Sequence, residues 1–405
     1  MSTRRPTLED YRTVVPAGTV DFLRRLSERV RGRRVLNVSV SREVGGVAEI
    51  LDGLVPLLEE VGVESAWETL DGDGSAAPLA ARLHHALQGG EERLPEEVLE
   101  QFLAFTRARA AALELAADMV LTHDALPAGL VEARPQEGAW VWRCHLDVSH
   151  PQRRAWTFLR QYVVKYEAAA FSLPAFAQRL PIPQFMIYPA IDPLSDKNRE
   201  LPARAVDGIC ERLGVPRDKP ILLQVGRFDR FKDPLGVIEA YRLVKRQHDC
   251  RLVLVGGAES DDPEGVELSA EVREAAERDD DLHVLELGAT ARVEVNALQR
   301  AATIVLQKST REGFGLGVAE AMWKSKPVIG GFAGGITAQV VYGVTGYTVN
   351  SVEGAAFRAR QLLADPELCT RLGQAARERV RQNFLITRHL GDMLALLATL
   401  VKRGT

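Results

Sequence analysis

Short apolar runs of strand type alternate with helical patterns along most of the chain. We predict strands at 33–40, 118–122, 139–144, 220–225, 251–255, 282–285, 302–306 and 327–329, and a helix at 47–60. Residues 71–98 are rich in Gly, Ala, Glu and Pro, and are predicted to form a loop between helices. The alternation itself predicts an α/β fold in which crossover helices join parallel strands.

The length of 405 residues suits two domains. Prolines are dense between 174 and 202 and resist regular structure, so we expect the chain to pass between domains there. The expected domains are 1–190 and 191–386. Residues 387–402 form a strong amphipathic pattern with no strand after them. We expect this last helix, with the residues up to 405, to pack back on the first domain.

Composition and charge narrow the classes of function. The net charge of −4 gives no bulk attraction for nucleic acid or an anionic membrane. No apolar run reaches the roughly 18 residues needed to span a bilayer, and the first residues lack the apolar core of a signal peptide. The cysteines, scattered without CxxC spacing, are Cys144, Cys210, Cys250 and Cys369. Reduced thiols and a cytoplasmic protein follow as expectations.

The most informative segment is 308–330, KSTREGFGLGVAEAMWKSKPVIG. Glu312 and Glu320 flank a turn spaced by glycines that runs into a predicted helix at 318–324. Glycine lets the backbone approach a ligand closely, and a helix N-terminus there favours a phosphate. A ligand with both phosphates and hydroxyls, such as a sugar nucleotide, would use the turn and both acids.

A second candidate cluster follows the predicted strand at 220–225. It reads GRFDRFK, with Arg227 and Lys232 as cations at the end of the strand. Arginine binds phosphate through two donors and lysine acts as a point charge, so the pair could stabilise a departing diphosphate. A solvated basic turn is the alternative, which the presence of the 308–330 segment makes the weaker interpretation.

Several motifs together resemble one known family, the retaining glycosyltransferases of family GT4. They are GRFDRFKDP (226–234), EGFGLGVAE (312–320), GGI (334–336), GVTGYTV (343–349), VWRCHLDVSHP (141–151) and GGVAEIL (45–51). The resemblance is strongest to the branch of trehalose glycosyltransferring synthases and trehalose phosphorylases. It implies the GT-B architecture, in which two Rossmann-like domains place parallel sheets across a cleft.

The resemblance also implies roles by position. Arg227 and Lys232 match the pair that holds the donor diphosphate, and Glu312 matches the acid that binds hydroxyls of the donor sugar. His145 matches a histidine beside the transferring sugar, and Asp124 is the matching contact to the acceptor. The remaining donor-binding positions are Gly45, Gly46, Gly313, Phe314, Gly315, Leu316, Gly317 and Glu320, the last at the ribose.

The chain departs from the pattern of this branch in two places. Ala125 and Leu126 follow His123-Asp124 where the branch has Pro and Gln, which weakens the assignment of Asp124. Gln339 stands where many GT4 proteins carry a glutamate.

Each assignment also has a structural alternative. Glu312 could cap a helix, Glu320 could lie on a solvated helix face, and His145 could be a buried structural histidine. Gly45 and Gly46 could form only a tight turn. A metal site at His145, Asp147 and His150 is disfavoured because the three have no recognised ligand spacing.

The resemblance implies transfer of glucose from UDP-, ADP- or GDP-glucose to free glucose, giving α,α-trehalose with retention and with reversibility left open. Retention without an obvious nucleophilic acid predicts attack on the face that the diphosphate leaves. Rival hypotheses are a trehalose phosphorylase using glucose 1-phosphate, a nucleotide-sugar 2-epimerase and a non-catalytic sugar-nucleotide sensor. No cofactor or metal is expected to be required, with stimulation by Mg²⁺ and a homodimer left open.

Overall fold

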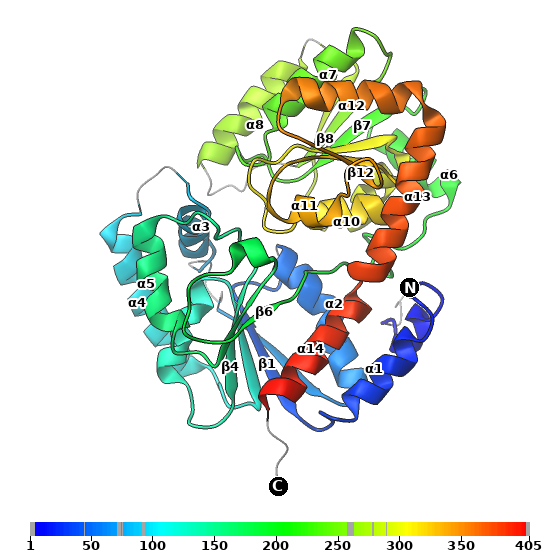
Figure 1. Ribbon diagram of the computed structural model, residues 1–405. Coiled ribbons are helices and arrows are strands. Elements are labelled where there is room, and N and C mark those ends of the chain that lie inside the picture. Colours follow the sequence, from blue (N-terminus) through cyan, green and yellow to red (C-terminus); the bar gives the residue numbers. More distant parts are fainter. Residues whose placement is uncertain are drawn as a thin grey trace. The chain divides into compact units, whose positions relative to one another are not determined.

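The structure is a computed structural model, and it describes residues 5–43, 45–70, 74, 76–90, 94–256, 263–277, 279–288 and 290–401. The chain divides into two compact units. The first unit runs to Ala190 and resumes at Leu385, and the second unit is Ile191–Phe384. Within the described residues, each unit contains one sheet of six parallel strands covered by helices (Figure 1).

The sheet of the first unit has the strand order β2-β1-β3-β4-β5-β6. Its strands are β1 (Arg34–Ser39), β2 (Glu64–Thr69), β3 (Met119–His123), β4 (Ala139–Cys144), β5 (Ala168–Phe171) and β6 (Gln184–Met186). Every residue of the central strands β3 and β4 is buried, as expected for a parallel sheet covered on both faces.

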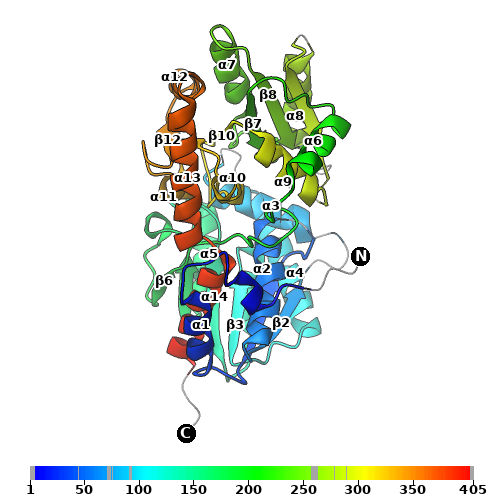
Figure 2. The same cartoon turned by 90° about the vertical axis from the view of Figure 1, so that its right-hand side faces the viewer.

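Helices cover this sheet and join its strands. They are α1 (Thr19–Ser27), α2 (Gly46–Glu60), α3 (Ala76–Leu87), α4 (Glu96–Ala112), α5 (Arg153–Val163) and α14 (Ile386–Leu400), with short 3₁₀ helices at Leu8–Tyr11, Leu126–Ala133 and Pro174–Phe176. The last helix, α14, packs against α1 and α2 (red beside dark blue in Figure 2). His389 on α14 also bonds through Nδ1 to the carbonyl oxygen of Tyr188 at 3.0 Å.

The sheet of the second unit has the order β12-β11-β10-β7-β8-β9. Its strands are β7 (Ile221–Val225), β8 (Arg251–Gly256), β9 (Leu282–Glu286), β10 (Ile304–Gln307), β11 (Val328–Gly331) and β12 (Gly346–Val349). Its helices are α6 (Ala203–Arg212), α7 (Pro234–Lys245), α8 (Pro263–Ala276), α9 (Arg292–Ala301), α10 (Leu316–Trp323), α11 (Gly334–Gln339), α12 (Val352–Ala364) and α13 (Pro366–Asn383). On one side of the sheet, α7 and α12 lie side by side over a core that includes Leu222, Val237 and Leu254.

Two sequence-based predictions need correction. The predicted loop at 71–98 contains helix α3, whose buried face is built from alanines and leucines such as Ala76, Leu79 and Leu83. Alanine is a strong helix former but a weak marker of an apolar face, so composition hid the helix. The proline-rich segment 174–202 also contributes strand β6, at the edge of the sheet, where proline on either side is tolerated.

Strands β2, β5 and β12 were not predicted. In β2 the pattern ESAWET buries only Trp67 fully, and β5 is mostly alanine, which has little strand preference. Among the described residues, no helix is long and apolar enough to cross a membrane, and the four cysteines form no disulfide.

A cluster of charges stabilises the amino-terminal edge of the second sheet. The carboxylate of Asp281, just before β9, lies 2.8 Å from Lys219 Nζ, 3.0 Å from Lys245 Nζ and 3.0 Å from Arg251 Nη2. These cations, with the Lys219 bond contributing most, lower the pKa of Asp281 to about 2. The Asp281 side chain is 14% exposed, so solvent only partly screens the cluster.

We expect Asp281→Asn to lower the free energy of unfolding at pH 7 by about 2 kcal/mol. Because the folded pKa lies below the unfolded value, the stabilisation is complete above pH ~4 and is lost as the pH falls toward the folded value. Urea unfolding from pH 7 to pH 2 measures this. Asp280→Asn, an exposed neighbour with the same charge change, is the control and should stay near wild type. Equal losses in both variants, or a loss that persists undiminished at pH 2, would contradict the role of the cluster.

Candidate active site

The glycine turn of the second unit leads into helix α10 beside the end of β7. Gly315 is the N-cap residue with φ 81° and ψ 72°, a conformation that strongly favours glycine, and α10 begins at Leu316, two residues earlier than predicted. A Cβ on Gly317 would lie 3.7 Å from the carbonyl oxygen of Val225. The first turn of α10 therefore lies next to the carboxyl end of β7, where an anion would meet its unpaired N–H groups.

An ion pair joins the loops that follow β7 and β10. Lys232 Nζ lies 2.5 Å from Glu312 Oε2, and the same oxygen accepts a hydrogen bond from Ser309 Oγ at 3.2 Å. Glu312 is 7% exposed, so the lysine offsets the cost of burying its carboxylate. The ammonium has two further N–H donors.

Arg227 and Asp229 lie in the same loop as Lys232. The Arg227 side chain is 60% exposed, and its Nη2 is 3.8 Å from Asp229 Oδ2. Asp229 Oδ1 accepts the backbone N–H of Lys232 at 3.0 Å, which fixes the turn, while burial raises the pKa of Asp229. The sequence analysis did not identify Asp229 or Ser309, because a single acid or serine in a loop has no distinguishing spacing.

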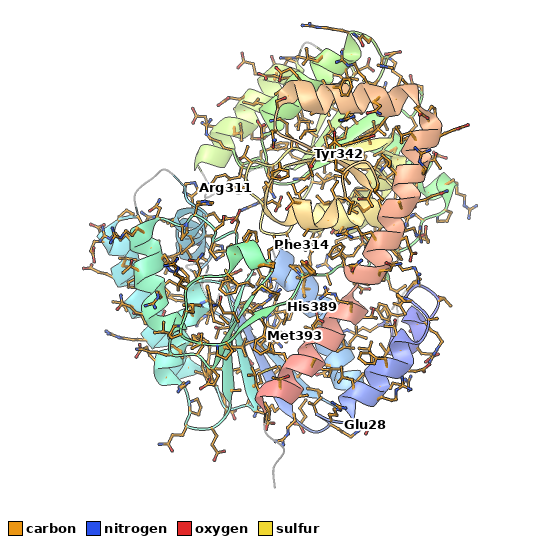
Figure 3. All side chains as sticks on the ribbon, in the orientation of Figure 1. Glu28, Arg311, Phe314, Tyr342, His389 and Met393 are labelled. Carbon is orange, nitrogen blue, oxygen red and sulfur yellow. The ribbon has the colours of Figure 1, made fainter. Side chains whose placement is uncertain are left out.

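Helix α11 holds the backbone of the glycine turn through hydrogen bonds. Gln339 is fully buried, and its Nε2 donates to the carbonyl oxygen of Phe314 at 2.5 Å and to those of Gly315 and Gly335 at 3.3 Å. Gly335 N–H donates to the carbonyl oxygen of Glu312 at 3.1 Å. Gln339, noted in the sequence only as a departure from the family pattern, thus fixes the turn by donating hydrogen bonds to its carbonyl oxygens. An ionised glutamate at this position could not donate these bonds. Phe314, labelled in Figure 3, is 5% exposed.

Glu320 is buried within the second unit. It is 1% exposed, so the alternative of a solvated helix face is wrong. Its Oε1 lies 3.0 Å from Lys197 Nζ, and its Oε2 accepts a hydrogen bond from Gln299 Nε2 at 3.2 Å. Lys324, one turn further along, donates to Asn198 Oδ1 at 2.8 Å, and burial lowers the pKa of Lys324 to about 7. A ribose bound at Glu320 would have to share the carboxylate with Lys197.

In the first unit, Asp124 and His145 lie together at the carboxyl ends of β3 and β4. Asp124 has φ 65°, is 6% exposed and accepts the backbone N–H of His145 through Oδ1 at 2.7 Å. Its own N–H donates to the carbonyl oxygen of Arg143 at 2.8 Å. Burial raises the pKa of Asp124 to about 7. The acid therefore fixes the backbone of His145 through Oδ1, and no described residue hydrogen-bonds to its Oδ2.

Two further features of the first unit bear on the site. Gly45, with φ 98°, is the N-cap residue of α2, and Gly46 is its first residue. Both are exposed after β1, at the same edge of the sheet as Asp124 and His145. Asp147, considered with His145 and His150 for a metal, instead accepts hydrogen bonds from the backbone and hydroxyl of Ser149. Within the described ranges, no group of three or more His, Cys, Asp and Glu side chains is arranged to hold a metal ion.

Within each unit, then, most of the residues singled out in the sequence gather at the carboxyl edge of a sheet. In the second unit these are Arg227, Lys232, Glu312 and Gly313 to Gly317, with Glu320 one turn further into α10. In the first unit they are Gly45, Gly46, Asp124 and His145. Ligands of open α/β sheets bind at this edge.

Comparisons with known proteins agree with this arrangement. A family profile described as "Trehalose synthase, N-terminal domain" matches residues 37–178, and one described as "Glycosyl transferases group 1" matches 208–379. The trehalose synthase of Pyrococcus horikoshii is 42% identical over 98% of both chains. The trehalose phosphorylase of Pleurotus pulmonarius is 25% identical over 92% of this chain and 58% of its own length.

Solved structures show the same fold at lower identity. Sucrose-phosphate synthase from Thermosynechococcus elongatus has a TM-score of 0.71 at 22% identity, over 90% of this chain and 99% of its own. Anabaena HepE, solved in complex with UDP and glucose, has a TM-score of 0.66 at 16% identity, over 91% of this chain and 100% of its own.

The similarity in sequence thus extends over both units and carries more than a shared fold. The molecule is a glycosyltransferase with the GT-B fold, and the predicted α/β fold class is confirmed. Within this class the chain belongs to the trehalose synthase family, as the sequence motifs indicated.

We expect Gly335→Ala to lower kcat/KM for the sugar donor by about 100-fold, the cost of misplacing a binding group by about an ångström. The added Cβ would lie 2.2 Å from Phe314 Cα and 2.6 Å from its carbonyl oxygen, so the turn must move. Steady-state kinetics at saturating acceptor, with thermal unfolding as a check of folding, measures the effect. Gly208→Ala on α6 is the control, because its Cβ meets nothing within 4 Å. Unchanged donor kinetics in a folded Gly335→Ala protein would show that the turn does not contact the donor.

Proposed function

We propose that this glycosyltransferase moves glucose from a nucleoside diphosphate glucose to the anomeric hydroxyl of free glucose, forming α,α-trehalose with retention of configuration. Membership of the trehalose synthase family supports the trehalose part of the proposal. The nucleotide donor and the synthetic direction are inferences from the site.

The observation that carries the proposal is the Lys232–Glu312 pair next to the start of α10. Glu312 offers a carboxylate suited to sugar hydroxyls, while Lys232 and Arg227 offer positive charge for a diphosphate. Because Lys232 retains two donors when paired, it can hold a phosphate oxygen without releasing Glu312. Fixed cations and helix N–H groups would then stabilise the charge that develops on the leaving diphosphate.

Retention is proposed to occur by attack on the face that the diphosphate leaves. A double displacement needs a carboxylate placed to attack the sugar. The acids around this site are engaged: Glu312 with Lys232, Glu320 with Lys197, and Asp229 with the backbone of Lys232. The leaving phosphate is therefore the base that receives the acceptor's proton, and His145 and Asp124 hold the sugars from the first unit.

Two alternative functions differ from the proposed reaction in the substrates that they need. A trehalose phosphorylase would use glucose 1-phosphate and have no ribose for Glu320. The matched phosphorylase is also much longer than this chain, which covers 58% of it. A nucleotide-sugar 2-epimerase would act on the donor without an acceptor.

We expect a screen of UDP-, ADP- and GDP-glucose and glucose 1-phosphate, each with and without glucose, to give trehalose only with a nucleotide donor and an acceptor. Carbon-13 NMR of the product identifies the α,α linkage directly. Trehalose from glucose 1-phosphate alone among the donors would establish a phosphorylase. Conversion of the donor sugar to its 2-epimer in the absence of glucose would establish an epimerase.

We expect Lys232→Ala to lower kcat by at least about 100-fold, because it removes a fixed charge that the transition state needs. Arg227→Ala should lower turnover strongly as well. Steady-state kinetics with the donor found in the screen measures both. Arg230→Ala, an exposed cation of the same loop, is the matched control and should stay within about threefold. Wild-type turnover in Lys232→Ala would refute its role at the phosphate.

Four further statements remain predictions. They are the absence of a required metal, any stimulation by Mg²⁺, a homodimer and a cytoplasmic location. Activity with EDTA, then with added Mg²⁺, tests the first two, and sedimentation tests the third.

A further inference from the structure

A chain of three side chains connects the interior of the first unit to His145. Asn37 on β1 is fully buried, and its Oδ1 lies 3.2 Å from His123 Nε2. His123 ends β3, is 5% exposed, and its Nδ1 lies 3.0 Å from His145 Nε2. The two imidazole planes are inclined by 22° with centroids 5.2 Å apart, so the rings meet edge to edge through their nitrogens rather than stacking face to face.

The orientation of the Asn37 amide sets which nitrogen of each ring carries a proton. Burial lowers the pKa of His123 to about 3 and holds the pKa of His145 well below its usual value, so each ring is neutral and has one N–H. In the structure Asn37 turns its amide oxygen toward His123 Nε2 and leaves its own buried Nδ2 without a partner. An amide oxygen can only accept, so in this orientation of the amide His123 donates from Nε2. Its Nδ1 is then bare and accepts from His145, which must carry its proton on Nε2.

The second nitrogen of His145 is left open. No described residue hydrogen-bonds to His145 Nδ1, and this atom is not among the buried polar atoms that lack a partner, so it reaches accessible space. The backbone of His145 is fixed separately by Asp124, through the 2.7 Å bond to its N–H. Both the position and the proton of this imidazole are therefore set from within the first unit.

We propose that His123, oriented by Asn37, is a positioning residue that holds His145 in the Nε2–H tautomer, so that His145 presents its bare Nδ1 to a sugar hydroxyl. The inference rests on the proposed function, in which His145 lies beside the transferred sugar. In this tautomer His145 accepts a hydrogen bond from the hydroxyl and cannot donate one. The group that binds to His145 Nδ1 must therefore carry an O–H donor, as the hydroxyls of a hexose do.

Two substitutions separate this role from simple packing. His123→Asn places an amide oxygen close to the position of Nδ1 and keeps an acceptor for His145. His123→Leu fills more of the same space without any acceptor. We expect His123→Leu to lower kcat about tenfold or more, with the donor KM within about threefold, and His123→Asn to retain most of the wild-type kcat. If packing were the role, leucine would match or exceed asparagine, and that order of activities would overturn the proposal.

The tautomer of His145 can be measured by NMR without following the reaction. In protein labelled with ¹⁵N-histidine, the unliganded wild type should show His145 with a protonated Nε2 and a bare Nδ1, assigned by loss of its signals in His145→Gln. His123→Leu should lose this preference, and His123→Asn should keep it. A protonated Nδ1 in the wild type, or an unchanged His145 spectrum in His123→Leu, would overturn the proposal.

The two experiments also keep this inference apart from the proposed function. Wild-type activity in His145→Gln would remove His145 from the sugar site, whatever its tautomer. A correct spectrum with no trehalose formed would reject the proposed reaction and leave the hydrogen-bonded chain intact.

Discussion

The ion pair between Lys232 and Glu312 is the interaction on which the second unit's site depends. It joins loops that follow adjacent strands, β7 and β10, so the sheet itself sets the distance between cation and acid. Without its partner, either group would be a poorly solvated charge in a partly buried position, which is costly. In the proposed donor complex, the phosphates lie on the lysine side of this pair and the sugar hydroxyls on the acid side. Binding a donor then adds contacts to an existing cluster instead of building one.

In each unit, buried or partly buried polar side chains hold the backbone that carries the candidate site residues. Gln339 holds the carbonyls of the glycine turn, Asp229 holds the amide of Lys232, and Asp124 holds the amide of His145. Each fixes a loop that has little secondary structure of its own. This preorganisation matters for transfer chemistry, because fixed dipoles and charges need not reorganise as charge develops.

The sequence predicted the strands that are rich in branched apolar residues, because they have a clear local pattern. It also predicted a glycine turn followed by a helix at 308–330, but the helix begins at Leu316, two residues earlier than predicted. It failed where the signal was spread across the fold. Helix α3 and strand β5 depend on alanine, whose burial is decided by neighbours. The partner of Glu320 could not be predicted, since Lys197 is distant in sequence and meets it only through packing. Likewise Gln339 and His123 acquire their roles from contacts that no spacing rule encodes.

The close contact between Gly335 and Phe314 couples two short motifs, EGFGLG and GGI, to each other. No side chain fits between the start of α11 and the turn, so neither stretch can drift while the other stays fixed. A substitution that moves the EGFGLG segment would therefore require a matching change in the GGI segment, or the contact between the two would be lost.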